Sequence, residues 1–245
     1  MKDLGRALLA LVFLCGASAA TAQLSVSTGG TFALNGGSLN LDGTGLQVNG
    51  VLSLAGGRLL NAANVAIGAG GTFDASNGQV TLSGDWSDAG SFLGGGSQVG
   101  FVDGPASSQI TGNTTFATLS FVSATGKNYV FGTGSTQTIS QLLTITGTAG
   151  APIQFRSSAA GQVANIDLLA GGAQNISHVG VSDVHATGQQ LAPNQTNEGG
   201  TGNATGWFAA VVQSAAVAAP ALSRWAAMLL GVMLAGFALR QRRPQ

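Results

Sequence analysis

Cysteine and charged residues are scarce in this chain of 245 residues, and each scarcity excludes some classes of function. Cys15 is the only cysteine, and it lies in the apolar run that opens the chain. The pattern of that run predicts its removal, which would leave no thiol. The remaining chain would therefore have no disulfide, no cysteine-based metal site and no cysteine nucleophile.

Basic residues are fewest between Gln23 and Ala219, where only Arg58, Lys127 and Arg156 occur. A nucleic-acid partner needs clustered Lys and Arg to neutralise phosphates, so no nucleic-acid binding is expected. The acids in the same segment are more numerous but stand apart: Asp42, Asp74, Asp85, Asp88, Asp103, Asp167, Asp183 and Glu198.

Reactive side chains offer few candidate sites. The histidines are His178 and His185, and strand spacing would place His185 on the same face as Asp183. Together with Asp167 they are the candidate residues of the alternative function, a surface polysaccharide lyase or hydrolase of the β-helix type. Such enzymes need clustered Asp, Arg, Lys or His, which this composition hardly supplies, so no catalytic residues are expected.

Metal and cofactor sites are also not expected. The closest acid pair is Asp85 and Asp88, which would hold Ca²⁺ weakly or serve as turn residues through their side chains. The glycine run Gly94–Gly96 lacks the lysine and the following helix of a phosphate-binding loop.

The first 22 residues are typical of a secretory signal. Lys2 and Arg6 precede a short apolar core, and Ala20-Thr21-Ala22 has the small-x-small pattern of a cleavage site. The mature chain is therefore predicted to begin at Gln23, and the protein to be exported.

A second apolar run, 225–239, lies near the C-terminus and is followed by a basic tail, 240–245. As a helix it would reach roughly 22 Å, less than the ~30 Å hydrocarbon core of a bilayer. Arginines at its ends would have to snorkel to the two membrane faces. Two interpretations follow from the physics: a temporary membrane stop, or a plain anchor that holds a periplasmic protein.

The order of residues in 220–245 resembles the IPTL-CTERM sorting signal of bacterial proteins, which is similar in plan to the PEP-CTERM class. The matching positions are Pro220, Leu222 and Trp225, followed by the apolar run and by Arg240, Arg242 and Arg243. The resemblance implies an exosortase-type membrane protease as partner, arrest in the inner membrane, cleavage near Pro220 and delivery to the cell surface. Residues 209–219 would then be the linker that presents this signal.

The body, 23–208, is predicted to be all-β. Apolar residues alternate with small polar ones between Gly, Asn and Ser, as expected of short strands with one buried face. The runs are Leu24–Val26, Leu39–Leu41, Leu52–Leu54, Val80–Leu82, Phe116–Phe121 and Leu143–Ile145.

A repeat of about 20 residues favours a β-solenoid, in which each coil stacks on the one before. Phe32, Leu52, Phe73 and Phe92 recur at equivalent positions and should form an interior stack. Each is preceded at two residues by a glycine expected to permit a tight corner: Gly30, Gly50, Gly71 and Gly90. An antiparallel sandwich would not explain this regular spacing.

Segments such as GNTTFATLSF in 112–208 resemble those of large bacterial surface proteins with right-handed parallel β-helix folds, and the resemblance implies that fold here. The body divides at 23–102 and 103–208, and Trp207 and Phe208 should close the last coil. The expected function is that of a structural or adhesin-like protein of the cell surface or extracellular matrix, in contact with surface polysaccharide or matrix.

Overall fold

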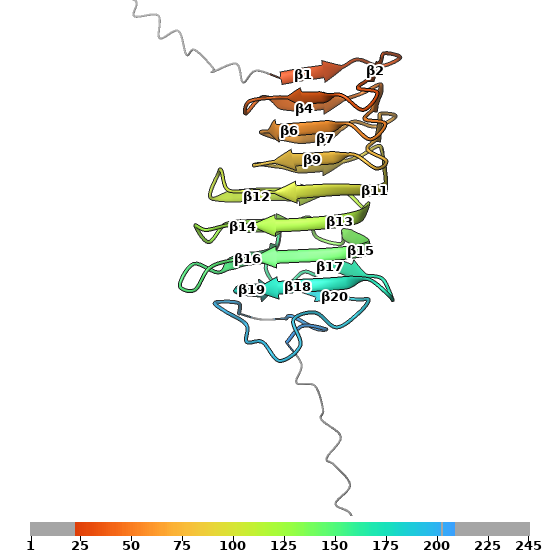
Figure 1. Cartoon of the computed structure of the whole chain (residues 1–245). Coiled ribbons are helices and arrows are strands. Elements are labelled where there is room, and N and C mark those ends of the chain that lie inside the picture. The colour runs from red at the N-terminus through yellow and green to blue at the C-terminus, as the bar shows by residue number, and fades with distance from the viewer. Residues whose placement is uncertain (1–22, 202, 209–245) are drawn as a thin grey trace, which may run out of the picture. The chain divides into compact units, whose positions relative to one another are not determined.

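A computed structural model describes residues 23–201 and 203–208, which form strands and no helix (Figure 1). No helix able to cross a membrane occurs in this part of the chain. The predicted signal segment, the linker, the apolar run 225–239 and the sorting motif lie outside the described residues.

The first three coils each contain three short strands. They are β1 (Gln23–Val26), β2 (Thr31–Ala33) and β3 (Ser38–Asn40); β4 (Gly45–Val48), β5 (Val51–Ser53) and β6 (Arg58–Ala62); and β7 (Val65–Ile67), β8 (Thr72–Asp74) and β9 (Gln79–Leu82).

The next three coils each contain one short and one long strand, and the last two return to short strands. The strands are β10 (Trp86–Asp88) and β11 (Ser91–Phe101); β12 (Ser107–Thr111) and β13 (Thr114–Val122); β14 (Asn128–Phe131) and β15 (Thr136–Thr146); β16 (Ile153–Ser157), β17 (Ala164–Leu168) and β18 (Ala173–Ser177); and β19 (Val179–Ser182) and β20 (Val184–Ala186).

The strands of successive coils pair in parallel. One 8-stranded sheet takes one strand from each coil, in the order β1-β4-β7-β10-β12-β14-β16-β19, which counts about eight coils. The remaining strands form a 12-stranded sheet that runs the length of the same stack. All pairings between named strands are parallel, and Figure 1 shows the coils lying one above another. The predicted parallel β-helix is confirmed.

The predicted interior stack has the expected register. Phe32 lies opposite Leu52, Leu52 opposite Phe73, and Phe73 opposite Phe92. Leu52 and Phe73 are fully buried, whereas Phe92 is half-buried and Phe32 is 41% exposed. Phe32 belongs to the first described coil, so it has a neighbouring coil on one side only.

The repeat glycines serve a different purpose from the one predicted. A Cβ on Gly50 would lie 2.2 Å from the Ser27 carbonyl oxygen, and one on Gly71 would lie 2.2 Å from that of Val48. These glycines therefore allow the backbones of neighbouring coils to approach closely. The positive φ angles of the corners belong instead to preceding residues such as Gly29 (75°) and Gly70 (82°).

The coil changes its cross-section at β11, where a corner disappears. β11 pairs through Ser91–Leu93 with β8 and through Gln98–Phe101 with β9, so this single long strand stacks on two short strands of the preceding coil. The turn that separates β8 from β9, Ala75–Gly78, has as its counterpart the glycine run Gly94–Gly96. This replacement of a turn by an extended segment positions the groove described below.

Residues 187–201 and 203–208 follow the last strand and fold over the final coil. Trp207 forms a parallel bridge with Leu191, is 5% exposed, and lies with its ring 6.1 Å from that of Phe155. The Phe208 amide donates to the Leu191 carbonyl at 3.0 Å. The prediction that Trp207 and Phe208 close the last coil is confirmed.

Candidate functional site

His178 and Asp183 stand at the two ends of β19, each at a corner with positive φ (51° and 57°). Five steps along a strand separate them by roughly 16 Å. His178 Nδ1 lies 3.1 Å from a Glu198 carboxylate oxygen, an ion pair when the ring is protonated. The Asp183 carboxylate accepts from the Gly161 amide at 3.0 Å. Each residue thus holds neighbouring chain segments together.

His185 and Asp167 lie on β20 and β17, where His185 is opposite Asn165 in the register. His185 Nε2 is buried without a hydrogen-bond partner in the part of the chain that the structure describes. No hydrogen bond or ion pair joins Asp183 to His185 there, and Asp183 lies at a positive-φ corner just before β20 begins. His178 and Asp183 are apart from each other, whereas His185 and Asp167 lie on paired strands two register positions apart, with no hydrogen bond between them among the described residues.

Asp85 directly precedes β10, and Asp88 is the last residue of that strand. One Asp85 oxygen accepts from the Gln109 amide of the next coil at 2.7 Å. Asp88 accepts from the Gly90 amide at 3.2 Å, as a turn residue does, and from the Thr114 hydroxyl at 3.0 Å. Burial raises the pKa of Asp88 despite these two hydrogen bonds. Within residues 23–201 and 203–208 no three potential metal ligands gather.

Lys127 is a buried cation, which no pattern in the sequence predicts. Its Nζ donates to the Ser83 carbonyl and, at 3.1 Å, to the Val102 carbonyl, and it lies 5.1 Å from the centre of the Tyr129 ring. Burial lowers the pKa of Lys127. Because both of its acceptors are main-chain carbonyls of earlier coils, the side chain ties coils together inside the stack.

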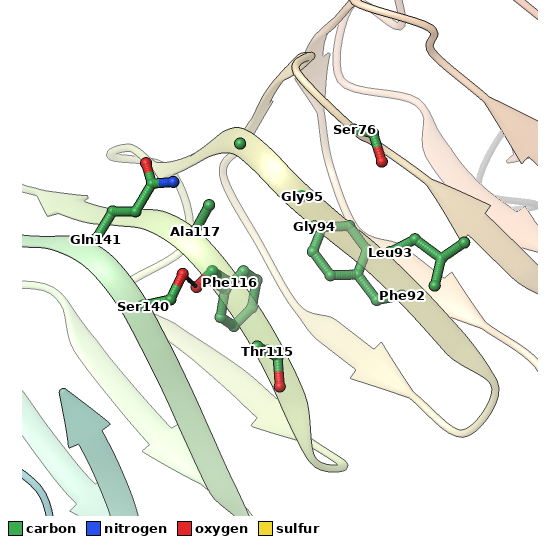
Figure 2. Close-up of a pocket in the computed structure, with 11 residues that line it drawn as sticks. Ser76, Phe92, Leu93, Gly94, Gly95, Thr115, Phe116, Ala117, Ser140 and Gln141 are labelled. Atoms are coloured by element: carbon green, nitrogen blue, oxygen red, sulfur yellow. Dashed lines mark hydrogen bonds between the residues drawn. The ribbon is translucent and has the colours of Figure 1, made fainter. Parts of the chain in front are cut away.

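A groove of about 470 Å³ opens on the side of the stack where β11, β13 and β15 run side by side (Figure 2). Its lining comes from four successive coils. The turn between β8 and β9 contributes Ser76; β11 contributes Phe92 to Gly96; β13 contributes Thr115 to Ala117; and β15 contributes Ser140 and Gln141.

The glycine run forms one wall of this groove, and Gly94 and Gly96 have no room for a side chain. A Cβ on Gly94 would lie 2.7 Å from the Thr115 carbonyl oxygen, and one on Gly96 would lie 2.5 Å from Asn77 Oδ1. The Gly95 carbonyl accepts from the Asn77 amide at 2.8 Å, which pulls the strand against the preceding turn. The register of β11 against β13 shifts between Gly94 and Gln98, as expected of a bulge.

No family model, curated protein or solved structure matches this chain.

The groove combines hydroxyl and amide groups with apolar surface, and its lining contains no ionisable side chain. Thr115, Ser140 and Gln141 are exposed, and Leu93 is 48% exposed. The half-buried Phe92 is held by ring contacts with Trp86, at 5.0 Å between centroids, and with Phe73, at 5.5 Å. Such a surface suits a neutral ligand with hydroxyl groups and an apolar face.

Proposed function

We propose that the protein is an exported, non-enzymatic β-solenoid with a structural or adhesin-like role at the cell surface or in the extracellular matrix. The observation that carries this proposal is the form of the body. The stack of parallel coils has a continuous apolar core, and Asp85, Asp183 and Lys127 serve as separate connections between coils. Function then depends on the shape and the neutral surface of the stack.

Export and sorting are the second part of the proposal, and the sequence pattern alone supports them. Residues 1–22 direct export and are removed after Ala22. Pro220, Leu222 and Trp225 then present the tail to an exosortase-type protease while 225–239 rests in the inner membrane. The basic residues Arg240, Arg242 and Arg243 stay on the cytoplasmic side.

Cell fractionation tests the sorting proposal. In a host that contains the sorting protease, the tagged wild-type body is expected in the surface or extracellular fraction, and the double variant Pro220→Ala/Trp225→Ala in the inner membrane. Ser214→Ala, in the linker, is the matched control and should behave as wild type. If the double variant reaches the same final fraction as the wild type, the tail is a plain anchor and sorting is rejected.

Adhesion is assigned to the groove beside the glycine run, with a neutral saccharide as the ligand. The apolar surface of Phe92 and Leu93 would pack against a sugar ring, and Thr115 and Gln141 would hydrogen-bond its hydroxyl groups. The absence of ionisable side chains from the groove lining favours neutral over acidic sugars.

Binding of the purified protein to a panel of neutral and acidic polysaccharides tests this assignment. The double variant Thr115→Ala/Gln141→Ala changes exposed positions and should weaken binding tenfold or more. Val122→Ala, exposed on β13 outside the groove, should leave binding unchanged. Retention of only acidic polysaccharides, or equal binding by the double variant, would place the contact elsewhere.

A further inference from the structure

The two ends of the described coil stack differ. At the C-terminal end, residues after β20 lie across the final coil and bond to it. The Thr201 amide donates to the Ser182 hydroxyl at 2.7 Å, and Gln195 Nε2 donates to the Ile176 carbonyl at 2.6 Å. The Arg156 guanidinium donates to the Gly199 carbonyl at 3.0 Å. This end of the stack is covered.

The N-terminal end has no such cover within the described residues. The strands of the first coil, 23–44, pair only with those of the second, β1 with β4, β2 with β5 and β3 with β6. Phe32 is 41% exposed, and Leu24, Leu34 and Leu39 are only partly buried although they pack against the core. An apolar sheet edge is therefore exposed to solvent.

The hydrogen bonds of β2 identify which backbone groups face outward. The Gly30 carbonyl accepts from Val51, and the Leu34 amide donates to Ser53, so these groups point to the second coil. Because backbone direction alternates along a strand, the N–H and C=O groups of Thr31 and Ala33 point to the open edge.

Natural sheet edges are usually protected by charge, proline or a bulge. The first coil contains no proline, lysine or arginine, and Asp42 is its only charged residue. An edge with these properties is suited to pairing with another strand.

We propose that the first coil docks onto the first coil of a second copy of this chain, edge to edge about a two-fold axis. Residues 187–201 and 203–208 cover the other end, so head-to-tail stacking is blocked and the contact must be between like ends. The near absence of charge lets two identical edges meet without repulsion. The two-fold axis makes the facing strands antiparallel and closes the assembly at a dimer. The proposal rests on the proposed function in one respect, because removal of residues 1–22 leaves β1 at the start of the chain.

The test is the molar mass in solution of the exported protein, measured by light scattering across a range of concentrations. We expect a dimer for the wild type and a monomer for Phe32→Lys, which places a cation on the edge. Ala33→Pro should also give a monomer, because it removes an edge-facing N–H without touching the pairing with β5. Val122→Lys, an equally exposed apolar position on the side of the stack, should remain dimeric.

Circular dichroism of each variant should show the wild-type strand content, so that loss of the dimer is not loss of the fold. A monomeric wild type, a dimeric Phe32→Lys, or a complex with a different protein at this edge would overturn the dimer. The intact mass of the same sample separates the two proposals. A monomer that lacks residues 1–22 rejects the dimer alone, whereas a chain that retains them contradicts the proposed export.

Discussion

The coils formed by β1–β9 and those formed by β10–β15 show two ways of stacking the same kind of repeat. In the first group each coil turns three corners, and glycines such as Gly50 and Gly71 let neighbouring backbones approach closely. In the second group one corner is replaced by a continuous long strand. Strands of successive coils pair in parallel in both groups. The number of corners per coil therefore changes along the stack, whereas the parallel pairing does not.

The interiors of the two groups differ accordingly. Small and branched apolar side chains fill much of the early coils, for example Leu52, Leu59 and Val65. In the coils of the second group a cluster of rings occupies the core, in which Phe121 contacts Tyr129 at 4.7 Å and Phe101 at 5.0 Å between centroids. Large aromatic side chains thus accompany the loss of a corner.

Truncating the ring cluster should have the largest effect on stability. Phe121→Ala removes a fully buried ring that contacts four others, and should cost about 3–5 kcal/mol of unfolding free energy. Leu52→Ala in the early coils should cost less than Phe121→Ala. Val122→Ala, at an exposed neighbouring position, should change little. Urea unfolding measures all three, and an equal cost for Leu52 and Phe121 would remove the distinction between the interiors.

The early coils should be the more sensitive to a methyl group on a repeat glycine. Gly50→Ala forces a Cβ to within 2.3 Å of two carbonyl oxygens, and should cost about 3 kcal/mol or more. Gly43→Asn is the control, because φ there is 78° with nothing within 4 Å, and asparagine tolerates that conformation. Thermal melting compares the two variants. A melting temperature for Gly50→Ala close to that of the wild type would contradict the close approach.

Lys127→Met tests the buried connection between the two groups of coils. Loss of the ammonium leaves the Ser83 and Val102 carbonyls without this donor, and we expect a cost of about 2 kcal/mol. Lys127→Arg keeps the charge, but the guanidinium differs in shape from the ammonium. This variant should therefore lose less unfolding free energy than Lys127→Met but remain less stable than the wild type. Urea midpoints measure both variants. A methionine variant as stable as the wild type would show that the lysine is not needed there.

The smallest expected effect is a change in how stability depends on pH in the acidic range. Hydrogen bonds from the Ser123 hydroxyl and the Ala124 amide lower the pKa of Asp103 below its ordinary 3.8. A carboxyl with a lowered folded-state pKa adds stability above the unfolded pKa, and this stability is lost as pH falls through the folded value. Asp103→Asn should therefore be less stable than wild type at neutral pH, with the difference shrinking below about pH 4. A difference independent of pH would contradict this.

The fold was predictable because it depends on two local patterns. Alternation within each strand gives the buried face, and the spacing near 20 residues brings Phe32, Leu52, Phe73 and Phe92 into register. The purpose of the repeat glycines was not predictable from sequence, since their contacts are with carbonyl groups of another coil. The terminal predictions, including the sorting motif, stay predictions.

Neither the groove nor the burial of Lys127 was predictable from the sequence, and the physical reason is the same for both. Gly94–Gly96 forms a wall of the groove only because Asn77, in the preceding coil, bonds to its backbone. Lys127 is buried only because carbonyls of earlier coils receive its ammonium. Asp183 lies at a corner with positive φ, before β20 begins at Val184, so the strand spacing assumed between it and His185 does not include a strand residue at 183. Each case depends on contacts between coils.

The most direct test of the account is the intact mass of the protein recovered from the surface fraction of producing cells. The chain of 245 residues has a mass of 24.1 kDa. We predict a smaller species that begins at Gln23 and has lost the sequence after about Pro220, with any attached group adding to that mass. A surface species that still contains both Lys2 and Arg243 would contradict it.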